Sequence, residues 1–201
     1  MKVIVIGATG TIGVEVAKAL SGNKHEVVRA SRNSDVKINL DDPASIRAMF
    51  EKVRDADAVV SCAGSAAFKP FADLTDADYE LGIRSKLMGQ VSVARMAKDY
   101  LHDGGSITLT TGELAMRPMV RSASVSMVNA GLEGFVRAAA LELPRKLRIN
   151  AVSPPWVKET MIKLGMDPTP GLASADVAKA YVAAVEGSDQ GKVLDPARLG
   201  A

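Results

Sequence analysis

The sequence has few of the residues that build disulfide, metal or membrane sites. Cys62 is its only cysteine, so no internal disulfide can form, and two histidines add too little to complete a zinc site. No apolar run approaches the roughly 20 residues of a membrane-spanning helix. The formal net charge is only +2, and the charged residues are scattered along the chain. We therefore expect no bound metal and no nucleic acid or membrane partner.

The N-terminus also lacks the features of a secretory signal peptide. Its apolar run, residues 3–6, ends at Gly7, whereas a signal peptide needs a longer apolar stretch and a small-residue cleavage site. The run is better interpreted as a first β-strand. With 201 residues, 47% of them hydrophobic, the chain can form one domain with a real core but no separate substrate domain. We expect a cytoplasmic monomer or homo-oligomer.

Short β-branched runs alternate with longer helical patterns, which is typical of βαβ units and a parallel sheet. The runs predict strands at residues 2–6, 26–30, 36–39, 58–61, 106–110, 148–152 and 192–194. The helical patterns predict helices at residues 11–21, 43–53, 76–101, 122–143 and 174–185. Together they predict a single α/β domain over residues 1–201, with about seven parallel strands and helices on both faces.

A glycine-rich turn joins the first strand to the first helix. Backbone N–H groups in such a turn can approach a pyrophosphate, whose negative charge is stabilised at the N-terminus of the helix. A tight turn that needs small residues only for packing is the alternative, but three glycines at this spacing exceed what one turn requires. The turn predicts a Rossmann-type, doubly wound dinucleotide-binding fold. The expected phosphate-binding residues are Gly7, Thr9, Gly10, Thr11, Ile12 and Gly13.

The end of the second strand indicates which dinucleotide is bound. NAD-selective sites carry a carboxylate near this point, which binds the adenosine ribose and repels a 2′-phosphate. Here the positions hold Ser31, a hydroxyl donor, and Arg32, a guanidinium suited to phosphate. Arg32 as a solvated loop residue is the alternative. The pattern favours NADP(H) over NAD.

From this turn onward the sequence resembles the short-chain dehydrogenase/reductase family over nearly its whole length. The resemblance is carried by several segments in the family's order. They are Ser-Cys-Ala-Gly at 61–64, Lys-Leu-Met-Gly at 86–89, Gly-Ser-Ile at 105–107, Ala-Gly-Leu at 130–132 with Gly134 and Phe135, and Arg-Ile-Asn-Ala-Val-Ser-Pro at 148–154. Pro155 stands where the family has glycine.

The resemblance implies further contacts and partners. Residues expected to line the dinucleotide site are Asn39, Leu40, Cys62, Ala63, Gly64, Asn129, Pro154 and Val157. The family's lid over a small-molecule substrate would be short here, with a small helix near residues 158–164. In relatives the helices that match 76–101 and 122–143 often build a dimer, so a homodimer or homotetramer is expected.

The same resemblance implies four catalytic positions, and this chain has changed all of them. The family's relay asparagine, serine, tyrosine and lysine correspond to Lys86, Gly112, Val125 and Asn129. Valine has no proton to give, and asparagine has no charge with which to lower the pKa of a neighbouring group. We hypothesise that Lys86 and Thr111 form an altered catalytic site. A surface cation and an ordinary strand residue are the alternatives, and Glu113 is a further candidate.

Three functions remain open from the sequence. The first is an NADP(H)-dependent oxidoreductase that acts on a small carbonyl or alcohol through a non-standard site. The second is an inactive dinucleotide-binding sensor or interaction protein, with no substrate. The third is a non-redox enzyme that keeps the dinucleotide only as a structural element. The fold cannot choose among them, because function depends on the site.

Overall fold

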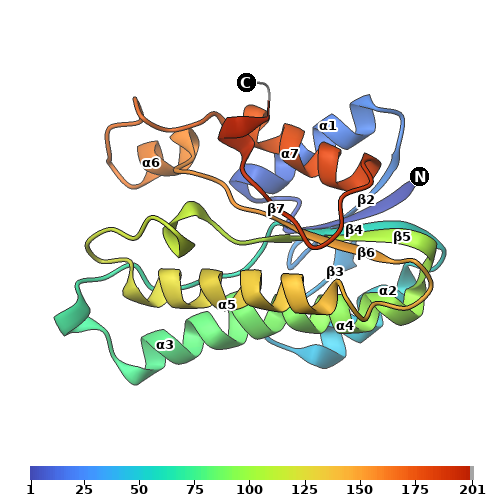
Figure 1. Ribbon diagram of the computed structural model, residues 1–201, viewed down its shortest axis with the longest axis horizontal. Helices are drawn as coiled ribbons and strands as arrows, with labels where there is room; N and C mark the ends of the chain where they lie inside the picture. The colour runs from blue at the N-terminus through green and yellow to red at the C-terminus, as the bar shows by residue number, and fades with distance from the viewer. Residues whose placement is uncertain (200–201) are drawn as a thin grey trace.

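The computed structural model describes residues 1–199 and contains a seven-stranded parallel sheet, in the order β3-β2-β1-β4-β5-β6-β7. This order, with helices on both faces, confirms the predicted doubly wound fold (Figure 1). The last two residues of the predicted domain, 200–201, lie outside the described residues. The strands are β1 (Lys2–Ile6), β2 (Glu26–Ser31), β3 (Val36–Lys37), β4 (Ala56–Ser61), β5 (Leu101–Thr110), β6 (Arg148–Val152) and β7 (Val193–Leu194).

The helices cover the sheet in two layers (Figure 1). One layer contains α1 (Thr11–Gly22) and α7 (Ser174–Glu186), and α6 (Lys158–Lys163) lies near their edge. The other contains α2 (Pro43–Lys52), α3 (Asp76–Gly82), α4 (Gly89–Tyr100) and α5 (Ala123–Ala139). Because neighbouring strand residues point to opposite faces, β1 contributes Ile4 and Ile6 to one core and Val3 and Val5 to the other.

The long helix predicted at residues 76–101 is not continuous. It is divided into α3, a π-helical turn η2 (Ile83–Met88) and α4. The amide of Gln90, a fully buried side chain, donates to the Lys86 and Thr110 carbonyl oxygens at 3.0 and 2.9 Å, and its oxygen accepts from Thr110 N–H at 2.8 Å. The wide turn therefore fastens Lys86 to the carboxyl end of β5. Hydrophobic periodicity alone did not distinguish a π-helical turn from an α-helical one.

Two helix starts follow the local sequence closely. Thr75 and Asp78 form a reciprocal capping box at α3, and the Asp42 side chain accepts from Ala44 N–H at 2.9 Å in front of α2. Strand ends differ more, since β5 begins at Leu101 rather than at 106. Within residues 1–199, no helix is long and apolar enough to cross a membrane, and no three His, Cys, Asp or Glu side chains are grouped to hold a metal ion.

Candidate functional site

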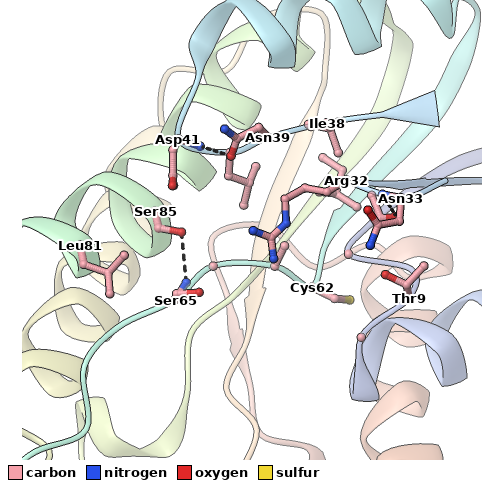
Figure 2. A pocket seen from close by; sticks show the side chains of 17 residues that line it. Thr9, Arg32, Asn33, Ile38, Asn39, Asp41, Cys62, Ser65, Leu81 and Ser85 are labelled. Atoms are coloured by element: carbon pink, nitrogen blue, oxygen red, sulfur yellow. Dashed lines mark hydrogen bonds between the residues drawn. The ribbon is translucent and has the colours of Figure 1, made fainter. Parts of the chain in front are cut away.

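A cleft of about 360 Å³ opens beyond the carboxyl ends of β1, β2 and β4, where the strand order reverses (Figure 2). In doubly wound sheets this reversal is the usual ligand-binding position. The predicted residues that line the cleft are Gly7, Thr9, Gly10, Ser31, Arg32, Asn39, Leu40, Cys62, Ala63 and Gly64. Thr11, Ile12, Gly13, Asn129, Pro154 and Val157 are not among its lining residues.

The glycine turn at the base of the cleft has a backbone that larger residues could not adopt. Gly7 has φ of +79°, and a Cβ there would lie 3.0 Å from the Ala63 Cβ. A Cβ on Gly13 would lie only 2.1 Å from the Gly7 carbonyl oxygen. Gly10 caps α1 without any side-chain hydrogen bond. The free N–H groups of the first helical turn are therefore not capped by a side chain, and they can donate hydrogen bonds to an anion.

Ser31 and Arg32 lie next to each other at the end of β2, but Ser31 is buried and Arg32 is exposed. The exposed Arg32 side chain extends toward the segment that carries Cys62 and Ser65 (Figure 2). The buried Ser31 hydroxyl accepts from Asn33 N–H at 3.1 Å and lies 3.0 Å from the Ser34 hydroxyl, to which it donates. Ser31 thus shapes the turn after β2, whereas the Arg32 guanidinium forms no hydrogen bond or ion pair within residues 1–199.

Seven lining residues were not predicted from the sequence. Ile6 and Ile38 directly precede the predicted Gly7 and Asn39. Asn33, Asp41 and Ser65 each directly follow a predicted residue, so extending each motif by one position would have found them. Leu81 and Ser85 come from α3 and η2, and only the folded chain brings them to the cleft; the Ser85 hydroxyl accepts from Ser65 N–H at 3.2 Å (Figure 2).

Cys62 and Gly64 connect this cleft to Lys86. Burial raises the pKa of the Cys62 thiol to about 12, so the thiol stays protonated at neutral pH. Gly64 has φ of +130°, and a Cβ there would lie 2.9 Å from the Lys86 Cα and 3.0 Å from its Cδ. The absence of a side chain at Gly64 therefore leaves the space that Lys86 occupies.

Lys86 and Thr111 are in contact, but the contact joins the Lys86 side chain to the Thr111 backbone. The half-buried Lys86 Nζ donates to the Thr111 carbonyl oxygen at 3.3 Å, and burial lowers the pKa of Lys86 to about 8. The Thr111 hydroxyl instead donates toward the Asn129 carbonyl oxygen at 3.1 Å and Glu133 Oε1 at 3.3 Å. The hydroxyl is thus bonded to α5, and the contact with Lys86 uses the Thr111 backbone.

Gly112 and Asn129 are sterically coupled. Gly112 has extended backbone, and a Cβ there would lie 2.9 Å from Asn129 Nδ2. The buried Asn129 Oδ1 has no hydrogen-bond partner among residues 1–199. An unsatisfied buried oxygen at this depth is costly, and a hydroxyl donor on a ligand would satisfy it.

Glu113, the further candidate, ties two loops together. Its carboxylate accepts from Trp156 N–H at 2.9 Å, and its own N–H donates to the Pro154 carbonyl oxygen at 2.9 Å. These bonds join the loop after β5 to the loop after β6. The geometry supports a positioning role for Glu113.

The chain is similar to known proteins over much of its length. Residues 7–190 match the family model described as enoyl-(acyl carrier protein) reductase. The chain is 31% identical to versicolorin reductase stcU of Emericella nidulans over 183 residues, which are 79% of this chain and 69% of that one. It is 35% identical to the hydroxynaphthalene reductase-like protein Arp2 of Metarhizium brunneum over 107 residues. That match spans 52% of this chain and only 40% of Arp2.

Two solved structures are similar over almost the whole chain. The protein lin1944 from Listeria innocua is 39% identical, with a TM-score of 0.91 over 97% of this chain and 98% of its own. A small-chain dehydrogenase in complex with NADPH is 27% identical, with a TM-score of 0.85 over 97% of this chain and 95% of its own.

Proposed function

The chain belongs to the short-chain dehydrogenase/reductase family, and we propose that it is an oxidoreductase that uses NADP(H) to interconvert a small carbonyl compound and its alcohol. The family binds NAD(P), and one of the similar structures is a complex with NADPH. Two of the similar proteins are named as reductases or reductase-like. The chain's own residues supply the further support.

The observation that carries the choice of NADP(H) is the Arg32 guanidinium in the cleft. Arginine binds phosphate through paired, charge-assisted hydrogen bonds, and no carboxylate stands at Ser31, Arg32 or Asn33 to repel a 2′-phosphate. NADP(H) differs from NAD(H) only by that phosphate. Arg32 would therefore select NADP(H).

The remaining residues fit the rest of the dinucleotide. The turn from Gly7 to Gly13, with its uncapped helix start, would hold the pyrophosphate. The unsatisfied Asn129 Oδ1 would accept from a hydroxyl of the nicotinamide ribose. Pro154 and Val157 stay predicted contacts on the nicotinamide side.

Lys86 would donate the proton that carbonyl reduction requires. The bound dinucleotide supplies the hydride for carbonyl reduction. Lys86 Nζ, with its pKa near 8, is largely protonated at neutral pH and would donate that proton to the carbonyl oxygen as the C–H bond forms. Gln90 and the Thr111 carbonyl hold the lysine at the carboxyl end of β5.

A dinucleotide-binding sensor without hydride chemistry is the second candidate. Two observations support this alternative: Val125 has no proton to give, and the Thr111 hydroxyl is bonded to α5. On this alternative, Lys86 would only line the nicotinamide end. Binding without turnover would be its signature.

Titration calorimetry with NADPH and NADH tests the cofactor, and nicotinamide absorbance with a panel of small carbonyl compounds tests turnover. Arg32→Gln should weaken NADPH binding about 10-fold and leave NADH unchanged, because one charged phosphate contact is lost. Arg29→Gln is the matched control, since Arg29 is also exposed on β2 but does not line the cleft. Equal effects of Arg32→Gln on both dinucleotides would remove the assignment to the 2′-phosphate.

We also propose a homodimer or homotetramer built on α5. Met127, Gly131, Gly134 and Leu141 are exposed, and a Cβ on Gly134 would meet nothing within 4 Å. Gly134 is therefore not required for packing within the chain, and a small surface residue permits close helix approach. Sedimentation velocity of the purified protein would reveal the assembly, and a monomer at all concentrations would contradict it.

A further inference from the structure

The short helix α6 is held firmly at the edge of α7. Both carboxylate oxygens of Glu159 accept from Ser174 N–H, at 3.3 and 3.0 Å. Lys158 N–H donates to the Leu172 carbonyl oxygen at 2.9 Å, and Leu172 N–H donates to the Trp156 carbonyl oxygen at 2.8 Å. These bonds fix both sides of the segment that carries α6.

The last residue of this helix, Lys163, reaches the phosphate-binding turn. Its exposed side chain donates from Nζ to the Thr11 hydroxyl at 2.7 Å. Thr11 is the first residue of α1 and directly follows Gly10, which lines the cleft. An ammonium group from the far end of the sequence thus lies beside the predicted pyrophosphate position.

The electrostatics at this contact lack a negative partner. The N-terminus of a helix carries partial positive charge, so a nearby cation is repelled unless an anion lies beside both. The first turn of α1 contains no acidic residue, and its cap, Gly10, has no side-chain acceptor. Within residues 1–199, Lys163 forms no ion pair with a carboxylate. An anion placed beside Thr11 would therefore interact favourably with both the Lys163 ammonium group and the start of α1.

The charges along the cleft show which anion fits. Among its described lining residues, Arg32 is the only lysine or arginine, and it lies at the end of β2 where the 2′-phosphate is expected. The pyrophosphate end has backbone N–H groups but no cation from the lining itself. We propose that Lys163 binds the pyrophosphate of the dinucleotide, so that α6 closes this end of the cleft. This inference depends on the proposed dinucleotide binding.

The test compares three probes by titration calorimetry: NADPH, NADH and adenosine 2′-monophosphate, which has no pyrophosphate. Lys163→Gln should weaken NADPH and NADH by a similar factor of about 10, because one charge-assisted hydrogen bond is lost, and should leave the monophosphate unchanged. Lys158→Gln is the matched control on the same helix, since Lys158 is exposed and, within residues 1–199, its side chain forms no hydrogen bond or ion pair with α1. Lys163→Arg should restore most of the affinity.

The outcomes separate this inference from the proposed function. If the wild-type protein binds NADPH but Lys163→Gln binds it equally well, the role of Lys163 is wrong and the proposed function stands. If the wild type binds neither dinucleotide, the proposed function is wrong, and the inference about Lys163 is wrong with it. An equal loss of affinity for the monophosphate would show a distorted cleft rather than a lost pyrophosphate contact, and would also overturn the inference.

Discussion

In the proposed function the site has a phosphate end and a nicotinamide end, and the two are built in different ways. At the phosphate end the backbone itself forms the site, and Gly7 and Gly13 leave no room for side chains. At the nicotinamide end the proposed chemistry would depend on side chains, and the family resemblance implies catalytic positions at Lys86, Gly112, Val125 and Asn129. A backbone site tolerates few substitutions, because each one changes the path of the chain. A side-chain site can change its chemistry while the fold remains.

This difference explains why binding and catalysis need separate tests. In the proposed function, dinucleotide binding would rely on the turn, the start of α1 and Arg32. Catalysis would rely on the environment of Lys86, which includes the π-helical turn and Gln90.

Lys86→Met should lower the turnover of a carbonyl substrate by about 1,000-fold, while NADPH affinity stays within a factor of about 3. Methionine keeps the apolar length of lysine but has no proton to donate. Because burial lowers the pKa of Lys86 to about 8, wild-type reduction should be constant below that pH and fall above it, as Lys86 loses its proton. Steady-state rates from pH 6 to 10 check both points.

Stability provides a second measurement for Lys86 that needs no substrate. Its pKa is about 8 in the fold and 10.5 in the reference state, so the unfolded chain binds more protons between these values. The free energy of unfolding should therefore rise from pH 8 to 10.5 in the wild type and rise less in Lys86→Met. If the two proteins show the same pH dependence of stability and of rate, Lys86 is not the proton donor.

Gly13→Ala should destabilise the protein by about 3 kcal/mol and weaken both dinucleotides together, because the new Cβ would lie against the Gly7 carbonyl oxygen. Gly22→Ala is the control in the same helix, where a Cβ would meet nothing within 4 Å, and it should be neutral or stabilise by up to about 1 kcal/mol. Urea unfolding and NADPH titration measure the two effects. Equal stability of the two variants would show that the turn adapts.

Most of the cleft lining could be predicted from the sequence, because its requirements are local. Three glycines within seven residues, placed between a strand and a helix, specify one backbone path, and ten predicted residues line the cleft. The parallel, doubly wound sheet follows from the alternation of strands and helices. Ser85 and Leu81 were missed, since their approach depends on how α3 and η2 pack.

The nicotinamide end could be predicted only in part, because its contacts link distant segments. The sequence indicated Lys86 and Thr111, but not that the Thr111 hydroxyl would bond to Asn129 and Glu133 instead of facing Lys86. The π-helical turn was missed because its cause is tertiary: Gln90 bonds both to the Lys86 carbonyl and to β5. Lys163 was missed for the same reason, since Thr11 lies 152 positions away in the sequence.

The smallest expected effect concerns the pair of Gly112 and Asn129. Gly112→Ser should destabilise the protein by about 1 kcal/mol. The new Cβ would lie 2.9 Å from Asn129 Nδ2, so the Asn129 side chain would have to move. Asn129→Ala removes both the Nδ2 atom that the new Cβ would meet and the unsatisfied Oδ1. Gly112→Ser should therefore destabilise the Asn129→Ala protein less than the wild type. A double-mutant cycle should give a coupling energy of about 0.5–1 kcal/mol. Urea unfolding of the four proteins measures it. If the two free-energy changes are strictly additive, the side chains at 112 and 129 are not coupled. That result would contradict a nicotinamide end made of interdependent side chains, in contrast to the backbone-built phosphate end.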